Sequence, residues 1–354
     1  MEITTIIFDW GDTLMVNFPQ YSGPMADWPE VQAMPGAEKI LASLAPNYRL
    51  VLASNAAESD AGLVKKALTR VNLDGYFQDI FTFHELGARK PDAGFFRAIE
   101  KRLNLSSRQC VMVGDSYADD ITGALAAGWQ GIWFNAAAQP CAGLMPRHEA
   151  EIYQLNDLTQ IMRQDFLPDW GTCNAWVMRH SPSLRLWLHV QLVAGIAYTL
   201  ALRLRQQGII NVSPLLAQRG GLLHDIAKLK TLHQTHTKNH GEMGYEILND
   251  YGQPELAEIS RRHILNAILE PERRPRTWEE KLVFYADKLA EGAHPVSLDE
   301  RVAALKKRYG QWAQSIEESV PALYALQCEL AQALALSTED ILPYLQTAFN
   351  GQNR

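Results

Sequence analysis

The sequence has few cysteines, and they form no metal-binding or disulfide pattern. Its four cysteines, Cys110, Cys141, Cys173 and Cys328, are scattered over 354 residues without a C-x-x-C pair. Such sparse use is typical of a reducing compartment and excludes a secreted scaffold held by disulfides. No basic stretch followed by an apolar run, as in a secretory signal, opens the sequence. We therefore expect a cytoplasmic protein.

Positive charge and long hydrophobic runs are also scarce. The sequence has 33 Lys and Arg against 40 Asp and Glu, which gives a formal net charge of -7. This charge argues against a protein that binds nucleic acid over its whole surface, but a local basic site is still possible. One apolar run, residues 186–202, approaches the length of a membrane span. His189 and Gln191 interrupt it, and Arg185 and Arg203 flank it closely. We expect a buried helix of a soluble bundle there, and no membrane partner.

The length and composition indicate two folded domains. A chain of 354 residues with 47% hydrophobic and 21% charged residues is too long for one ordinary domain and can bury ample core without disulfides. Histidine is unevenly distributed, because eight of the ten histidines fall between His180 and His294. The two halves of the chain are therefore expected to differ in their chemistry.

The first half alternates between short apolar runs and helical patterns. The apolar runs, rich in β-branched residues, are 3–8, 50–54, 110–114 and 131–134. Helical periodicity occupies residues 37–44, 59–71, 93–103 and 119–127. This alternation is typical of a doubly wound α/β domain with a parallel sheet, in which chemistry gathers at the carboxyl ends of the strands.

The second half contains helical patterns almost throughout, from Leu184 to the end. Between the halves, residues 164–183 contain Pro168, Gly171 and Pro182 and show little periodicity. The sequence therefore predicts an α/β domain over 1–163, a linker over 164–183 and an all-α domain over 184–354. The helical stretch from Leu305 onward carries no recognisable chemistry, and we expect it to pack on the bundle or on a second subunit.

Polar residues follow predicted elements of the first half in a fixed order. They are Asp9 in FDWGDTL, Ser54 and Asn55 in LASNA, Lys90 in GARKPDAGFF, and Asp115, Asp119 and Asp120 in VGDSYADD. One strand-end aspartate alone is commonly a turn or cap residue. Together and in this order, these residues resemble the four motifs of the haloacid dehalogenase-like (HAD) superfamily, over roughly residues 1–163.

The resemblance implies a phosphoryl-transfer site that works through Mg²⁺. Asp9 would be the nucleophile that becomes an aspartyl phosphate, while Ser54, Asn55 and Lys90 would hold the phosphate. The implied Mg²⁺ ligands are Asp9, the backbone carbonyl of Gly11, Asp115 and Asp120. Asp119 is the alternative to Asp120, although it lies one residue short of the usual family spacing.

The first motif departs from the pattern of family phosphatases, which usually read DxDGT. Gly11 stands where the second Asp would act as general acid and base, and Asp12 comes one place later. Asp12 would replace that acid only if the loop turns differently. The gaps of 45 residues from Asp9 to Ser54 and 36 from Ser54 to Lys90 leave little room for an inserted cap, so we expect a nearly capless domain.

The second half gathers histidines and aspartates in helical contexts. Its candidate residues are His189, the pair His224-Asp225, His240, His263 and Asp287. Ionisable residues on apolar helix faces are costly unless they are paired or metal-bound, and these types suit a catalytic transition-metal site. The set resembles the HD metal-dependent phosphohydrolases, over roughly residues 181–310.

This second resemblance implies His189, His224, Asp225 and Asp287 as ligands of a first metal. His240 and His263 would bring in a second metal, so that one or two of Fe, Mn, Zn, Co or Ni are expected. For His233 and His236 two roles are open: either residue would be a metal ligand in place of His240, or it would face the substrate. Lys228, one turn after the His-Asp pair, is expected to contact phosphate.

The two resemblances together predict a bifunctional phosphohydrolase. The HD site would open a phosphodiester or cyclic phosphate, and the HAD site would remove the resulting monoester. The partner would be a phosphorylated small molecule, a nucleotide or an RNA end, and a homo-oligomer is open. In the alternative, motivated by Gly11, only the HD site is catalytic and the HAD-like domain is a binding or regulatory module.

Overall fold

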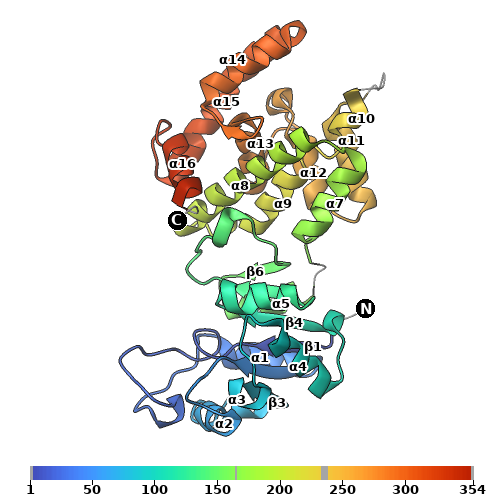
Figure 1. Ribbon diagram of the computed structural model, residues 1–354. Helices are drawn as coiled ribbons and strands as arrows, with labels where there is room; N and C mark the ends of the chain where they lie inside the picture. Colours follow the sequence, from blue (N-terminus) through green and yellow to red (C-terminus); the bar gives the residue numbers. More distant parts are fainter. Residues whose placement is uncertain (1–2, 164–165, 233–237, 352–354) are drawn as a thin grey trace. The chain divides into compact units, whose positions relative to one another are not determined.

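The computed structural model describes residues 3–163, 166–232 and 238–351, which form two compact units (Figure 1). The α/β unit comprises Met1–Ala137 and His148–Phe166, and the helical unit comprises Ala138–Arg147 and Leu167–Arg354. The predicted order of an α/β domain followed by a helical one is confirmed. Helix α7 (Trp170–His180) lies inside the segment expected to be a linker, where the sequence pattern indicated no helix.

The α/β unit is built on a six-stranded parallel sheet with the order β3-β2-β1-β4-β5-β6. Its strands are β1 (Thr5–Phe8), β2 (Arg49–Ser54), β3 (Asp79–Thr82), β4 (Cys110–Gly114), β5 (Gln130–Phe134) and β6 (Ala150–Ile152). The four predicted strands are present, and β3 and β6 extend the sheet at its two edges. β1 therefore lies between β2 and β4, at the point where the strand order reverses.

Alternate residues of each strand enter cores on opposite faces of the sheet. Ile6 and Phe8 pack with α1 (Ala37–Leu44) and α2 (Ala61–Thr69), whereas Ile7 packs with α4 (Ala93–Leu103). Because side chains alternate with a period of two, a strand buried on both sides is apolar on both faces, as residues 6–8 of β1 are. The doubly wound arrangement follows from this pattern.

Short elements complete the α/β unit, and none of them forms a separate cap. They are η1 (Met25–Asp27), η2 (Asp74–Tyr76), α3 (Phe83–Leu86), η3 (Ser107–Gln109), the π-helix η4 (Tyr117–Ile121), α5 (Thr122–Ala126), η6 (Leu155–Asp157) and α6 (Leu158–Ile161). Within the described residues of this unit, the longest segment between β1 and β2 outside α1 is the loop around η1. Arg70 fastens this loop to the end of α2 by donating hydrogen bonds to the carbonyls of Ala26 and Trp28.

The helical unit is organised around α8 (Leu184–Gln206), which packs against α9 (Pro214–Leu223) and α13 (Trp278–Lys288). A Cβ atom added at Gly221 would lie 2.6 Å from the Cα of Ala194, so only glycine lets α9 approach α8 this closely. The other elements are η5 (Ala142–Leu144), α10 (Lys228–Leu232), α11 (His240–Asp250), α12 (Pro254–Arg262), η7 (Leu265–Leu269), β7 (Ala290–Glu291), β8 (His294–Pro295), α14 (Leu298–Arg308), η8 (Gly310–Trp312), α15 (Ala313–Leu334) and α16 (Ile341–Gly351).

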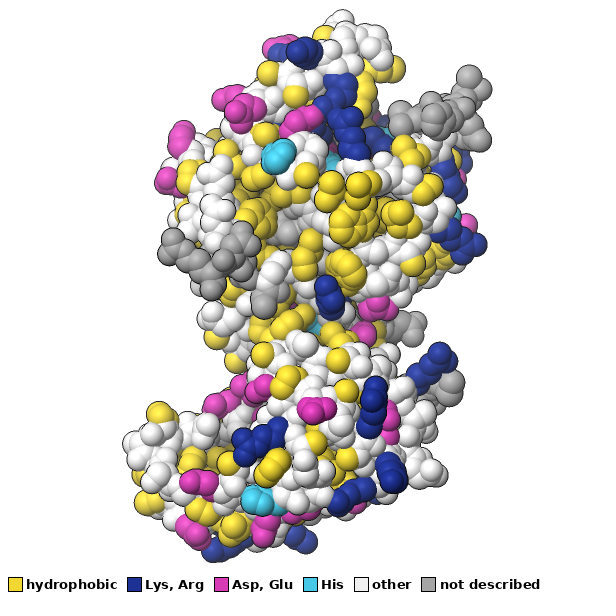
Figure 2. Space-filling view, viewed as in Figure 1, with side chains coloured by type: hydrophobic (Ala, Val, Ile, Leu, Met, Phe, Trp, Pro, Cys, Tyr) yellow, Lys and Arg dark blue, Asp and Glu magenta, His cyan; other side chains and the backbone are white. Residues whose placement is uncertain are grey.

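Helix α8 is the apolar run noted in the sequence. By length and composition it is the one described helix that could cross a membrane, and 67% of its most apolar window is buried inside the structure. Its buried residues join the core of the helical unit, as expected for the central helix of a bundle. Lys and Arg side chains gather on the part of this unit where α14 lies (Figure 2).

Candidate active sites

The aspartate site, defined here as Asp9, Lys90, Asp115 and Asp120, lies at the carboxyl ends of adjacent strands. Asp9 follows β1 and Asp115 follows β4, and these strands pair in parallel so that their ends coincide. One oxygen from each of Asp9, Asp115 and Asp120 falls within 4.8 Å of the other two. The sheet order thus brings together side chains that lie more than 100 residues apart in the chain.

Lys90 is the central cation of the aspartate site. Its Nζ donates to Asp9 Oδ1 at 2.5 Å, to Asp120 Oδ1 at 2.5 Å and to the carbonyl of Ala53 at 3.0 Å, and the residue is only 4% exposed. Burial alone would lower the pKa of Lys90, but the two carboxylates outweigh it and raise that pKa above its usual value. Lys90 therefore stays charged beside Asp9.

The remaining carboxylates are tuned by burial and by Thr13. Burial, with the Asp9 charge beside it, raises the pKa of Asp115 to about 6 and that of Asp120 to about 7. The Thr13 hydroxyl donates to Asp115 Oδ1 at 2.9 Å and accepts from the Asp115 backbone N–H at 3.1 Å. Three crowded carboxylates, two of them with raised pKa values, are the donor set expected of a Mg²⁺ site, since a divalent cation would relieve their repulsion.

The choice between Asp119 and Asp120 follows from the π-helix η4. Asp120 is buried and joins the carboxylate group, whereas Asp119 is partly exposed and uses its backbone N–H to bond Ser116 Oγ at 3.2 Å. A Cβ atom added at Gly114 would lie 2.2 Å from Asp120 Oδ2, so the glycine that ends β4 makes room for this carboxylate. The geometry favours Asp120, the residue preferred from the sequence.

The loop after Asp9 places Gly11 and Asp12 differently. Asp12 is exposed, has a positive φ of 54° and accepts a hydrogen bond from the Asn17 N–H at 3.0 Å, so it lies outside the carboxylate group. A Cβ atom at Gly11 would meet nothing closer than Asn17 Nδ2 at 3.9 Å. The position where the family pattern has an acid is therefore open, and Asp12 is committed to the turn.

The residues expected to bind phosphate have distinct surroundings. Ser54 ends β2, is buried and accepts a hydrogen bond from the Ala56 N–H at 3.2 Å, which leaves its own proton for another acceptor. Asn55 donates to the Lys90 carbonyl at 2.9 Å and accepts from the Lys90 N–H at 2.8 Å. Its amide thus holds the Lys90 backbone in place, and its predicted phosphate contact stays a prediction.

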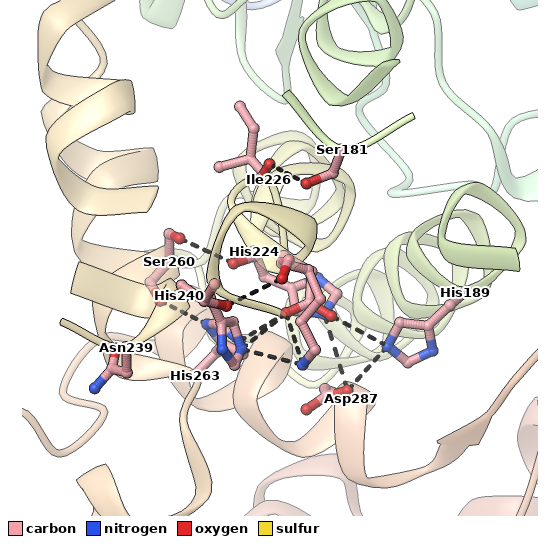
Figure 3. Close-up of polar contacts among 12 residues, drawn as sticks. Ser181, His189, His224, Ile226, Asn239, His240, Ser260, His263 and Asp287 are labelled. Atoms are coloured by element: carbon pink, nitrogen blue, oxygen red, sulfur yellow. Dashed lines mark hydrogen bonds and ion pairs between the residues drawn. The ribbon is translucent and has the colours of Figure 1, made fainter. Parts of the chain in front are cut away.

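The histidine site, defined here as His189, His224, Asp225, His240, His263 and Asp287, draws on five helices (Figure 3). His189 lies inside α8 and Asp287 inside α13, while His224 and His263 follow the last residues of α9 and α12 and His240 begins α11. His224 Nδ1 lies 2.7 Å from the Gly221 carbonyl, and His263 Nδ1 lies 2.5 Å from the Ser260 carbonyl. Each ring thus caps a carbonyl left free in a last helical turn and turns its Nε2 inward.

One part of the site, called here the His189 group, contains His189, His224 and Asp287. His189 Nε2 lies 3.1 Å from Asp287 Oδ1, and His224 Nε2 lies 3.9 Å from the same oxygen. Asp225 Oδ2 faces this group at 3.6 Å from His224 Nε2 and 4.0 Å from His189 Nε2. The four residues expected to hold a first metal therefore converge.

The other oxygen of Asp225 faces a second set, called here the His240 group, of His240 and His263. Asp225 Oδ1 lies 3.0 Å from His240 Nε2 and 3.2 Å from His263 Nε2. Lys228 Nζ lies 3.3 Å from the same oxygen and 3.1 Å from His240 Nε2. Asp225 thus presents one oxygen to each group, which is the arrangement of a carboxylate that can bridge two cations. His233 and His236 lie outside the described residues.

The ionisation of these side chains fits metal binding. Burial lowers the pKa of His224 to about 3 and lowers the pKa values of His240 and His263, so these three imidazoles are neutral, as ligands must be. Burial opposes ionisation of Asp225 and Asp287, but the adjacent cations and histidines hold their pKa values well below the usual range. His224 Nε2 is buried, has no hydrogen-bond partner among the described residues, and faces two carboxylate oxygens. A lone pair in that position calls for a cation, so the residues fit a metal.

Sequence reasoning missed three residues that contact the sites. Thr13 links Asp9 and Asp115, and its signal was its place four residues after Asp9 in the first motif. Lys288 Nζ donates to Asp287 Oδ2 at 2.8 Å and follows it directly in sequence. Arg301 lies 3.5 Å from Asp287 Oδ1 but comes from α14, and no local pattern marks it.

Comparison with known proteins assigns both units to families. Residues 4–128 match the haloacid dehalogenase-like hydrolase model, and residues 186–292 match the HD domain model. An uncharacterized protein of Methanocaldococcus jannaschii is 36% identical over 37% of this chain and 82% of its own length. The pyrimidine 5'-nucleotidase PynA of Streptococcus pneumoniae is 30% identical over 38% of this chain and 56% of its own length. A solved structure of an uncharacterized protein from Listeria monocytogenes serotype 4b has a TM-score of 0.41 and 26% identity, covering 46% of this chain and 99% of that one.

The chain belongs to the HAD-like hydrolases through its α/β unit and carries an HD domain in its helical unit. The predicted fusion of these two families is thereby confirmed. At the level of the families, so is the predicted enzyme class, a metal-dependent phosphoric ester hydrolase. The chain spans 56% of the length of the nucleotidase PynA. The substrate in that protein's name therefore describes the nucleotidase and not this chain.

Proposed function

We propose that the protein is a bifunctional phosphohydrolase acting on nucleotide or RNA-end phosphoesters. The histidine site would open a phosphodiester or a cyclic phosphate, and the aspartate site would release phosphate from the resulting monoester. The observation that carries this proposal is the pair of largely buried clusters, one in each unit, each combining carboxylates with a lysine that can face phosphate. Two consecutive ester cleavages are the chemistry that such a pair supports. We place this activity in the cytoplasm, in keeping with the sparse cysteines.

The donor types suggest a different metal for each site. Asp9, Asp115, Asp120 and the Gly11 carbonyl would hold Mg²⁺, which takes oxygen ligands. The His189 and His240 groups, joined by Asp225, would hold one or two of Fe, Mn, Zn, Co or Ni. When bound, such metals act as Lewis acids on phosphoryl oxygens and favour the ionisation of water.

In the aspartate site, the chain's own residues can carry a two-step transfer. An Asp9 oxygen would bond to phosphorus while the bond from phosphorus to the ester oxygen breaks, and the leaving oxygen takes a proton from water. Water would then cleave the aspartyl phosphate, releasing inorganic phosphate and restoring Asp9. Lys90 would offset the phosphoryl charge, since it stays protonated at 2.5 Å from Asp9, and the Ser54 hydroxyl would donate to a phosphoryl oxygen.

In the histidine site, Asp225 would join the two groups of ligands and Lys228 would bind phosphate. Asp225 would hold the two halves of the site together, because each of its oxygens faces a different group. The Lys228 ammonium stays charged, since Asp225 and Asp287 outweigh burial and raise its pKa, and it would donate hydrogen bonds to a phosphoryl oxygen. Its partial exposure leaves it open to an arriving anion.

Two variants separate the sites. We expect Asp9→Asn to abolish monoester hydrolysis and to leave diester cleavage unchanged, whereas Asp225→Asn does the reverse. The measurement is phosphate release and diester cleavage on a panel of nucleotide mono-, di- and cyclic esters with Mg²⁺, Mn²⁺ or Fe²⁺. Asp250→Asn, an exposed carboxylate at the end of α11, is the matched control. If the wild type hydrolyses no ester in this panel, the proposal is wrong.

A second candidate function is favoured by the loop around Gly11. Position 11 has no side chain, and the Asp12 carboxylate is engaged by the Asn17 N–H, so neither residue supplies an acid beside Asp9. In this candidate only the histidine site is catalytic, and the α/β unit binds a phosphate ligand or regulates the helical unit. Monoester hydrolysis that is absent from the wild type, together with retained phosphate binding, would favour it.

A further inference from the structure

Helix α14 lies beyond residues 186–292, which match the HD domain, yet it contributes a buried cation to the histidine site. Arg301 is 8% exposed, and its Nη2 lies 3.5 Å from Asp287 Oδ1. We propose that Arg301 is a positioning residue that fixes Asp287 for metal binding in the His189 group. The inference rests on the proposed metal-dependent function of this site.

Both oxygens of Asp287 are held by cations of the chain. Oδ2 accepts from Lys288 Nζ at 2.8 Å, while Oδ1 faces Arg301 and, at 3.1 Å, His189 Nε2. A carboxylate held at both oxygens cannot rotate about its last side-chain torsion without losing one ion pair. Arg301 and Lys288 therefore fix the plane of the Asp287 carboxylate and leave Oδ1 aimed at the two imidazoles.

Arg301 is itself held in place by Glu291, near the end of the HD match, and by the helix that follows it. Its Nη1 pairs with Glu291 Oε2, and the other oxygen of Glu291 pairs with Arg308 at the end of α14. The helix begins at a capping box in which the Ser297 and Glu300 side chains bond each other's backbone N–H groups. Arg301 Nε is buried and has no hydrogen-bond partner among the described residues. The guanidinium is therefore oriented by its contacts with Asp287 and Glu291, although this orientation leaves one N–H group without a hydrogen bond.

Two opposing effects act on metal affinity at the His189 group. A guanidinium near a divalent cation repels it, which would make removal of Arg301 tighten binding. Loss of the guanidinium also frees Asp287 Oδ1 and leaves Glu291 with one buried partner fewer. Outer-shell partners of metal ligands typically contribute about 10- to 100-fold in affinity, so we expect the loss of positioning to dominate.

The experiment is a Co²⁺ titration of metal-stripped full-length protein, followed by the visible absorption of the bound ion. We expect the wild type to bind two equivalents in the helical unit. Arg301→Met should weaken one equivalent by about 10- to 100-fold and leave the other, assigned to the His240 group, unchanged. Arg301→Lys should restore part of the loss, because it keeps a cation near Asp287 but lacks the planar fork.

Arg308→Met is the matched control, since it removes an ion pair to the same Glu291 without touching Asp287. It should leave both Co²⁺ affinities at the wild-type value. The inference is overturned if Arg301→Met binds both equivalents as the wild type does, binds them more tightly, or weakens them together with a lower melting temperature of the metal-free protein. A wild type that binds no Co²⁺ would instead overturn the proposed function of the histidine site, and the inference with it.

Discussion

In the aspartate site a side chain of the protein, Lys90, lies between two carboxylates, at 2.5 Å from Asp9 and 2.5 Å from Asp120. In the histidine site the oxygens of Asp225 and Asp287 face imidazole nitrogens, and the cations that share those oxygens lie farther away. Lys228 Nζ is 3.3 Å from Asp225 Oδ1, and Arg301 Nη2 is 3.5 Å from Asp287 Oδ1. One site thus has a buried lysine paired closely with two carboxylates, whereas the other is lined mainly by imidazoles, with its cations at longer distances.

This difference bears on what each site does without metal. Ion pairs to Lys90 already offset part of the repulsion among the carboxylates of the aspartate site. The histidine site leaves His224 Nε2 buried without a hydrogen-bond partner among the described residues, close to Asp225 Oδ2 and Asp287 Oδ1. A buried unsatisfied group costs about 1–3 kcal/mol, so the helical unit has more to gain from a bound cation.

The largest change is expected from Gly11→Asp in the aspartate site. A Cβ at position 11 would have Asn17 Nδ2 as its nearest neighbour, 3.9 Å away, so the loop has room for the side chain that the family pattern has at this position. A general acid contributes about 10²–10⁴-fold, and we expect kcat/KM for alkyl phosphomonoesters to rise within that range. Steady-state phosphate release is the measurement.

Gly11→Asn is the control, because it has the same shape and no transferable proton at neutral pH. Equal rates for the Asp and Asn variants would show that position 11 is not where a proton is delivered. If neither variant nor the wild type releases phosphate, the α/β unit is the non-catalytic module of the second candidate function, and only the histidine site is an active site.

Metal removal should separate the two units by stability. A ligand at 100 to 1,000 times its Kd stabilises the fold by about 2.7–4.1 kcal/mol, and we expect a transition metal to contribute this much to the helical unit. Mg²⁺ should contribute less to the α/β unit, since Lys90 remains in place. Calorimetry before and after chelation measures both transitions. If Mg²⁺ stabilises the α/β unit as much as the transition metal stabilises the helical unit, then Lys90 does not make the aspartate site less dependent on metal.

Gly114→Ala tests how tightly the aspartate site is packed. Its Cβ would lie 2.2 Å from Asp120 Oδ2, so the carboxylate must move away from Lys90. Overpacking of this kind typically costs about 1–3 kcal/mol, and we expect a loss of that size in both Mg²⁺ affinity and unfolding free energy. Gly75→Ala, where nothing lies within 4 Å of the new Cβ, should change neither. A Gly114→Ala variant with wild-type Mg²⁺ affinity would show that Asp120 is not held by this contact.

The sequence predicted which side chains lie together in each site better than it predicted the helices and strands around them. Asp9 and Asp115 directly follow β1 and β4, whose apolar residues mark where the strands end, whereas Asp120 is predicted from the motif spacing of the family that the sequence resembles. β3 escaped detection because its first two residues, Asp79 and Ile80, are only partly buried at the sheet edge, so no apolar run marks it. The motifs can be recognised from short stretches of sequence, whereas the formation of an edge strand depends on its pairing with the neighbouring strand.

Tertiary contacts explain the remaining differences. Helix α7 was hidden between Pro168 and Pro182, and Gly171 lies in its first turn, after the Asp169 side chain caps the helix at the Thr172 N–H. Asn55 is predicted to bind phosphate, and the structure adds a contact that the sequence does not reveal, the pair of hydrogen bonds between its amide and the Lys90 backbone. A residue such as Arg301 acts through Asp287, and only the packing of α14 against the site brings the two together.

The smallest effect expected is that of Ser260→Ala, which tests the support of the histidine site. Ser260 Oγ donates to the His224 carbonyl at 2.9 Å and is fully buried, while its own carbonyl faces His263 Nδ1 at 2.5 Å. The serine thus joins the two histidines that follow α9 and α12. A hydrogen bond of this kind is worth about 0.5–1.5 kcal/mol, and we expect a loss of this size in unfolding free energy together with a few-fold weaker metal affinity.

Ser319→Ala is the matched control for that variant. Ser319 is equally buried and donates to the Ser315 carbonyl at 2.9 Å, but it lies on α15, which carries no residue of the histidine site. Both variants should therefore lower the urea midpoint by similar amounts, while only Ser260→Ala weakens Co²⁺ binding. Equal Co²⁺ affinity in the two variants would mean that His224 and His263 are held by their helix-end carbonyls alone, without the serine that links them.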